Sequence, residues 1–73
     1  MINLKKLGKC CRDYRKTLGI SQTTVAEEIH YTTQAVSHFE KGNNDSFSLV
    51  SWYLLHGLTF DDLVNGGVFN EIR

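Results

Sequence analysis

Three histidines and two cysteines are among the side chains in this chain that could perform acid–base, nucleophilic or metal chemistry. His30, His38 and His56 fall in different segments, and no Ser-His-Asp set, Cys-His set or glycine-rich phosphate loop accompanies them. Cys10 and Cys11 are adjacent, so on a helix they point about 100° apart and cannot bridge each other. No Cys or His stands at the spacing of zinc ligands. The sequence therefore predicts no enzyme, no catalytic residue, no metal and no cofactor.

A second group of polar side chains lies in the segment TTQAVSHFEK, residues 32–41. Its apolar residues Ala35, Val36 and Phe39 recur at the spacing of one helix face, which leaves Thr, Gln, Ser and His on the outer face. Such side chains can meet the hydrogen-bonding groups of a partner, or they can simply be solvated. The pattern alone leaves both interpretations open.

The size and composition of the chain limit the kinds of fold that can position these residues. The 73 residues suffice for one domain, 41% of them are apolar, and proline is absent, which favours an all-α fold. No apolar run is long enough to span a membrane, and no apolar stretch follows the N-terminal lysines as in a secretory signal. With only two cysteines, we expect a reduced, cytoplasmic protein without a membrane partner.

The formal net charge of zero hides an uneven distribution. Residues 1–20 contain six basic residues and one acidic residue, a net charge of +5, whereas residues 21–73 contain two basic and seven acidic residues, a net charge of −5. The sequence thus predicts a basic first helix and an acidic remainder.

Apolar periodicity and capping residues predict five helices. Only His30 and Tyr31 separate the second from the third, and so short a joint makes two helices cross steeply, as in a helix-turn-helix. The expected ranges are about Asn3 to Leu18, then a helix capped by Ser21, one capped by Thr32 and ending near Gly42, one from roughly Phe47 to His56, and one capped by Thr59 that spans Phe60 to about Asn65.

The same periodicity predicts which residues face the core. One of the two cysteines is expected inside and the other at the core's edge, and His56 is expected to interact with the C-terminus of the fourth helix. Residues 1–67 would form the domain, and residues 68–73 a tail whose apolar residues have no obvious place. The expected inward residues are Leu4, Leu7, Cys11, Tyr14, Leu18, Val25, Ala26, Ile29, Ala35, Val36, Phe39, Phe47, Val50, Leu54, one of Trp52 and Tyr53, Phe60, Leu63 and Val64.

Four pieces of sequence, from Leu7 to Leu63, occur in a familiar order and spacing without insertion. They are LGKCCRDYRKTLGISQ, VAEEI, TTQAVSHFEKG and GLTFDDL. In these pieces the chain resembles the Cro/repressor-type (XRE-like, lambda-repressor-like) helix-turn-helix family of phages and bacteria. The resemblance implies a compact four- to five-helix DNA-binding domain.

The resemblance also implies roles for individual residues. Thr32–Lys41 would be the recognition helix in the major groove, Gln22 would touch a phosphate or brace the first side chain of that helix, and the loop after Lys41 would meet the DNA backbone. A Gln can make two hydrogen bonds to adenine, worth about 1–3 kcal/mol of discrimination, and a Thr methyl suits a thymine methyl. The implied DNA-binding residues are Gln22, Thr32, Thr33, Gln34, Ser37, His38, Lys41, Asn43 and Asn44.

One further pair is implied to be structural. Arg15 and Glu40 fall where relatives pair an Arg of the first helix with a Glu that ends the recognition helix. Such a pair would hold the recognition helix to the rest of the domain. Removing one partner of a well-buried pair costs about 3–5 kcal/mol.

The sequence departs from the family pattern in the turn and in the loop. Relatives place Gly at position 30, where a left-handed residue is needed, and this chain has His30. The loop Asn43-Asn44-Asp45 lacks the Lys or Arg of DNA-binding relatives, and residues 21–45 contain one Lys against four acidic residues. Phosphate contacts would then depend on cations of the first helix, although most of that helix is expected to point away from the groove.

Two functions follow from the resemblance. The first is a sequence-specific transcriptional regulator, a Cro-like repressor that binds a double-stranded operator and has no small-molecule substrate. It would form a homodimer through its fourth and fifth helices and its tail. The alternative is an antirepressor or modulator that uses the same fold to bind a partner repressor protein, with Trp52, Tyr53 or Phe69 as aromatic anchors. The operator sequence and the choice between repression and activation do not follow from the sequence.

Overall fold

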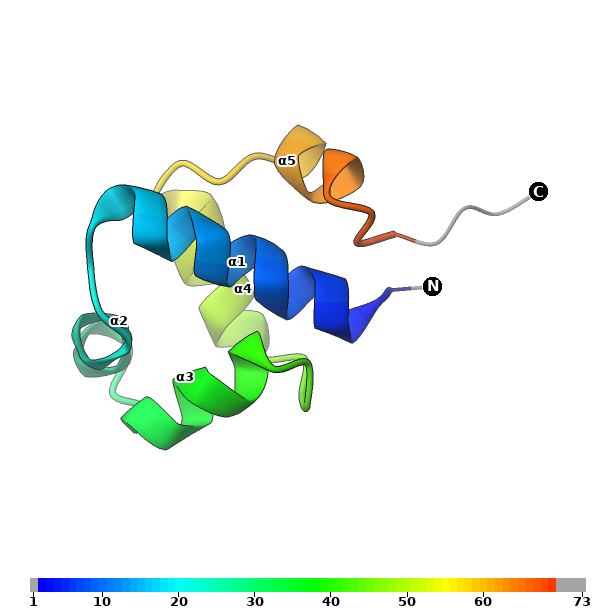
Figure 1. Cartoon of the computed structure of the whole chain (residues 1–73). Coiled ribbons are helices and arrows are strands. Elements are labelled where there is room, and N and C mark those ends of the chain that lie inside the picture. Colours follow the sequence, from blue (N-terminus) through cyan, green and yellow to red (C-terminus); the bar gives the residue numbers. More distant parts are fainter. Residues whose placement is uncertain (1, 70–73) are drawn as a thin grey trace.

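The computed structural model describes residues 2–69, which form five helices (Figure 1). The prediction of an all-α fold is confirmed, because residues 2–69 contain no strand beyond one isolated antiparallel bridge between Ile2 and Phe69. None of these helices has the length and apolar character needed to cross a bilayer. The helices are α1 (Leu4–Leu18), α2 (Gln22–Glu28), α3 (Thr33–Glu40), α4 (Phe47–Leu55) and α5 (Phe60–Asn65).

Each helix begins at a polar residue whose side chain satisfies a free backbone N–H of the first turn. At α5 the arrangement is reciprocal, since Thr59 and Asp62 each accept a hydrogen bond from the backbone N–H of the other. At the other end of α1, Gly19 takes the left-handed conformation that ends the helix, with φ 72°. The five capping residues are Asn3, Ser21, Thr32, Ser46 and Thr59, and the caps at Ser21, Thr32 and Thr59 confirm the prediction from the sequence.

The core lies beneath α1, which packs against α3 and α5. Figure 1 shows α1 between α3 on one side and α5 on the other, with α4 behind it. Cys11 is fully buried there, and burial raises the pKa of its thiol to about 12, whereas Cys10 lies at the edge of the core, as predicted. The buried apolar residues are Leu7, Cys11, Val25, Ala26, Val36, Phe39, Leu49, Trp52, Tyr53, Leu58, Leu63 and Val68.

Polar contacts attach α4 to α1 and α2. The indole N–H of Trp52 donates to Glu28 at 2.9 Å, and the ring of His56 stacks on Trp52 with centroids 3.9 Å apart. His56 Nδ1 also lies 2.7 Å from the backbone oxygen of Trp52, in line with the expected interaction of His56 with the helix C-terminus. The hydroxyl of Tyr14 in α1 donates to the backbone oxygen of His56 at 2.7 Å.

The predicted inner face of α4 is wrong at Phe47 and Leu54, whereas Val50 is partly buried against the core. Phe47 is 83% exposed and Leu54 is largely exposed, while Leu49 and both aromatic residues, Trp52 and Tyr53, are buried. The sequence FSLVSWYLL is apolar at nearly every position, so its periodicity does not select one face. The structure also corrects three other residues predicted to face inward, namely Leu18, Phe60 and Val64, which are 40%, 65% and 49% exposed.

The segment after α5 also differs from expectation. Val68 is buried, and its backbone oxygen accepts a hydrogen bond from the N–H of Asn3 at 2.7 Å. Phe69 packs against Phe60 with ring centroids 5.0 Å apart. The expectation that these two apolar residues lack a place in the core is therefore wrong, and residues 70–73 of the predicted tail lie outside the described residues.

Candidate nucleic-acid interface

The joint between α2 and α3 is a tight turn at His30. His30 has φ 60°, and it is the one non-glycine residue with positive φ among those described. The N–H of the next residue, Tyr31, donates to the backbone oxygen of Ala26 at 2.8 Å and closes the end of α2. His30 thus supplies the left-handed residue that the turn requires, as the family resemblance implied.

Helix α3 presents a polar face to solvent. Its inner residues Val36, Phe39 and Glu40 are buried. Gln34, His38 and Lys41 are exposed, and their spacing of four and three residues places them in one line along the helix. Thr32, Thr33, Asn43 and Asn44 are also exposed, whereas Ser37 is partly buried at the edge of this face.

A buried ion pair holds the C-terminal end of α3 against α1. The guanidinium of Arg15 donates two hydrogen bonds to the carboxylate of Glu40, from Nε to Oε2 at 2.7 Å and from Nη2 to Oε1 at 3.1 Å. The two side chains are only 10% and 3% exposed. Arg15 also donates to the backbone oxygen of Ile20 at 2.9 Å, so one side chain joins α1, the turn before α2 and α3. The pair implied by the resemblance is therefore present.

Gln22 joins this ion pair. Its side-chain amide donates to Glu40 Oε1 at 2.9 Å, so Gln22 braces the last residue of α3. The first residue of α3 is reached instead by Thr23, whose hydroxyl lies 3.3 Å from that of Thr33. Thr23 was not predicted from the sequence to be part of the site, although its place one residue after the predicted Gln22 puts it on the same exposed turn. Two side chains of α2 thus contact the two ends of α3.

The hydroxyl of Tyr53 lies beneath the same network. It is buried, and no other described residue forms a hydrogen bond with it. Burial raises the pKa of Tyr53, the nearby charge of Glu40 raises it further, and Arg15 opposes the shift. Tyr53 therefore stays a neutral phenol that packs against the charged pair.

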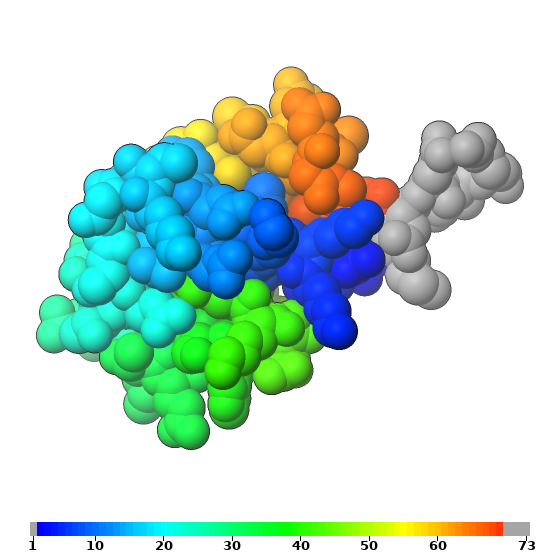
Figure 2. Space-filling model, in the orientation of Figure 1, coloured from blue at the N-terminus to red at the C-terminus, as the bar shows by residue number. Residues whose placement is uncertain are grey.

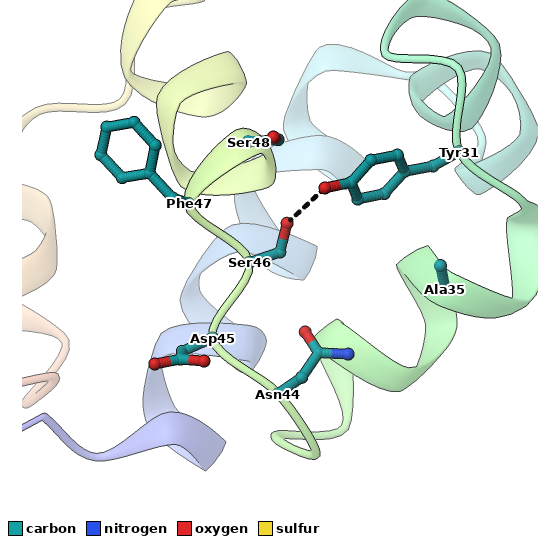
Figure 3. A pocket seen from close by; sticks show the side chains of 7 residues that line it. All are labelled: Tyr31, Ala35, Asn44, Asp45, Ser46, Phe47 and Ser48. Carbon is teal, nitrogen blue, oxygen red and sulfur yellow. Dashed lines mark hydrogen bonds between the residues drawn. The ribbon is translucent and has the colours of Figure 1, made fainter.

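A hollow of about 450 Å³ lies beside α3, between its N-terminal part and the start of α4. Figure 3 shows Tyr31 and Ser46 pointing toward each other across it, with their hydroxyl oxygens 3.3 Å apart. Hydrogen bonds with Ser46 and Ser48 lower the pKa of Tyr31. The hollow thus connects the joint before α3 with the loop after it, and the sequence analysis named neither Tyr31 nor Ser46 as part of the site.

The family comparison matches the region that contains these contacts. A family model described as helix-turn-helix matches residues 12–50, more than half of the chain. The chain belongs to the Cro/XRE-type helix-turn-helix family. This is a family of DNA-binding regulators and not of enzymes. A search of the curated proteins and a search of the solved structures each found no match.

The matched region of this helix-turn-helix protein contains every residue that the sequence analysis assigned to DNA contact, from Gln22 to Asn44, and both members of the Arg15–Glu40 pair. The loop after α3 within that region carries Asn43, Asn44 and Asp45, and so has no cation for a phosphate. Among residues 2–69, no group of three or more His, Cys, Asp or Glu side chains is arranged to hold a metal ion. The outer side chains of α3 and this loop offer mainly hydrogen bonds, and Lys41 at the end of α3 offers one cation.

Proposed function

We propose that this helix-turn-helix protein is a sequence-specific, Cro-like repressor that acts in the cytoplasm and inserts Thr32–Lys41 into the major groove of its operator. The observation that carries the proposal is the support of α3. Arg15, Gln22 and Glu40 fix one end of the helix through buried and partly buried hydrogen bonds, while its outer side chains, such as Gln34 and His38, are exposed. A rigid helix with exposed polar side chains suits the reading of base edges.

The exposed residues divide between bases and phosphates in this proposal. Gln34 would pair with adenine through two hydrogen bonds, Thr33 would place its methyl group against thymine, and His38 would donate to guanine or to a phosphate. Lys41, Asn43 and Asn44 would contact the backbone that borders the groove. Gln22 would act mainly as the brace of Glu40, because its amide N–H is already paired there.

A homodimer would present two recognition helices about 34 Å apart, one turn of DNA, on a palindromic operator. An apolar groove supports this part of the proposal. The groove has a volume of about 310 Å³, and the exposed rings of Phe47 and Phe60 lie at or next to it. Apolar surface of this kind is typical of protein contacts. The groove is lined by Ile2, Leu7, Asp45, Phe47, Val50, Leu63, Val68 and Phe69.

The test is DNA binding by wild-type protein and by Gln34→Ala. Fluorescence anisotropy at low salt would use duplexes from the DNA that flanks the coding sequence, with a scrambled duplex as competitor. We expect specific binding that Gln34→Ala weakens by about 5- to 150-fold for each half-site, the equivalent of a lost two-bond base contact in each protomer. Asn65→Ala is the matched control, because Asn65 is an exposed amide in α5, on the other side of α1 from α3 (Figure 1).

Two results would contradict the proposal. One is the absence of binding to any duplex at low salt. The other is binding that Gln34→Ala and Asn65→Ala change equally.

One observation favours the alternative, an antirepressor that binds a partner repressor protein. Phe47 and Phe60 are exposed, and the loop after α3 is free of cations, as a protein-binding surface would allow. Trp52 and Tyr53 cannot serve as its anchors, because both are buried, and Phe69 is only partly exposed. Co-elution of the protein with the regulator encoded beside it, combined with a lack of DNA binding, would favour this function over the first.

A further inference from the structure

The start of α1 packs directly on the end of α3. A Cβ added to Gly8 would lie 2.4 Å from the backbone oxygen of Phe39 and 2.6 Å from that of Glu40, so the two backbones touch. One turn before Gly8 in α1, Lys5 lies against Gly42. A Cβ added to Gly42 would lie 2.7 Å from Lys5 Cα and 2.8 Å from Lys5 Cγ. In Figure 2 the start of α1 (blue) accordingly lies beside the end of α3 and the loop that follows it (green). The side chain of Lys5 therefore leaves α1 next to Gly42, the residue after Lys41.

Two cations at this junction are available to a ligand. Lys5 and Lys41 are both exposed, and no carboxylate among residues 2–69 forms an ion pair with either. Glu40, the nearest acidic residue along the chain, already accepts hydrogen bonds from Arg15 and Gln22. Lys9, by contrast, pairs with Asp13 at 2.9 Å.

We infer that Lys5 and Lys41 form a phosphate-binding pair at the C-terminal end of the recognition helix. This inference rests on the proposed function and deepens it. The pair supplies one cation from α1 and one from the end of α3, and so takes the place of the Lys or Arg that the loop 43–45 lacks. It also offsets the partial negative charge of the α3 C-terminus, which would otherwise repel a phosphate. The ligand is the backbone of duplex DNA, independent of its sequence.

Lys5 and Lys6 provide a matched comparison. They are adjacent and exposed, and Lys→Gln removes one positive charge at either position while keeping Cβ and Cγ. The two side chains take different directions. Lys5 lies next to Gly42, whereas Lys6 Nζ lies 3.2 Å from the position of a Cβ on Gly67, beyond α5. A general loss of attraction to DNA would affect both variants equally, whereas a contact at the junction would affect Lys5→Gln alone.

The experiment measures the dissociation constant for the specific duplex and for a scrambled duplex over a range of salt concentrations. Each phosphate contact contributes about 0.9 to the slope of log K against log salt. We expect Lys5→Gln and Lys41→Gln each to reduce the slope by about 0.9 for each protomer bound, or about 1.8 for the proposed homodimer, on both duplexes, and Lys6→Gln to leave it unchanged. Thermal melting of the same variants detects any loss of fold.

The outcomes separate this inference from the proposed function. If wild-type protein binds DNA and needs Gln34, but Lys5→Gln and Lys6→Gln have equal slopes, the phosphate pair is disproved and the proposed function stands. If Lys5→Gln lowers the melting temperature without changing the slope, Lys5 only stabilises the end of α3, and the inference is again wrong. If wild-type protein binds no DNA, both fail.

Discussion

The two halves of this domain are held together by different forces. In the helix-turn-helix half, α3 is attached to its neighbours by directed polar contacts, with Arg15 and Gln22 both hydrogen-bonded to Glu40. In the other half, α4, α5 and residues 68–69 bury Leu49, Leu63 and Val68, and the side-chain hydrogen bonds that attach α4 to α1 and α2 are at least partly exposed and include no buried ion pair among the described residues. Hydrogen bonds to a charged group fix a position and an angle, whereas apolar contact favours burial without fixing orientation. The half with directed contacts is the one that must present α3 in a fixed orientation.

Removing Arg15 should have the largest effect, and it tests the helix-turn-helix half, which is called the polar half below, the other half being the apolar half. Arg15→Ala leaves the carboxylate of Glu40 buried without its main partner, and we expect a loss of about 3–5 kcal/mol in the free energy of unfolding. For a domain of this size, each kcal/mol corresponds to a fall of about 4–8 °C in the melting temperature. Thermal unfolding followed by circular dichroism measures the change.

The neighbouring Lys16→Ala serves as control, since Lys16 is exposed and forms no ion pair with residues 2–69. A melting temperature of Arg15→Ala within one degree of wild type would show that the ion pair does not hold the two helices together. Because Arg15→Ala could leave the chain unfolded, Arg15→Lys is a useful second variant. It keeps the charge but loses the two-bond geometry, so it should fall between Arg15→Ala and wild type.

Val68→Ala should have the next largest effect, and it tests the apolar half. Val68 is 1% exposed, and removing its two methyl groups costs about 2 kcal/mol from lost burial and the cavity that remains. Val64→Ala is chemically identical at a site that is 49% exposed, so it should cost well under half as much. Urea unfolding of both variants gives the comparison. Equal costs would mean that the chain after Gly67 adds no stability to the core.

The sequence predicted the polar half better than the apolar half, and the reason is physical. Capping residues such as Ser21 and Thr32 mark helix starts through specific hydrogen bonds, so the joint between α2 and α3 could be placed closely from sequence. The amphipathic pattern of α3 likewise identified Val36 and Phe39 as buried. The DNA-facing residues and the Arg15–Glu40 pair, however, came from the family resemblance and not from periodicity.

The sequence of the apolar half contains no comparable markers. In α4 nearly every residue is apolar, and only packing against α1 and α2 determines that Leu49 is buried and Phe47 exposed. Val68 lies far in sequence from its partner Asn3, so no local pattern could reveal their hydrogen bond. The Gln22–Glu40 contact and the approach of Lys5 to Gly42 were missed for the same reason. These features depend on how segments distant in sequence pack together in the folded domain.

The smallest effect is expected at the joint of the polar half, where His30→Gly should stabilise the domain slightly. A left-handed conformation costs a non-glycine residue roughly 1–2 kcal/mol, and His30 has φ 60°. Glycine removes that cost but gives the unfolded chain more freedom, which returns about 0.5–1 kcal/mol. The expected net gain is therefore about 0.5 kcal/mol, measured by urea unfolding. His30→Val is the opposite control, because a β-branched side chain tolerates this conformation worst. If His30→Gly lost stability instead, the imidazole would be making a contact that outweighs the strain, and the joint would owe its angle to that side chain as well as to the polar contacts of α3.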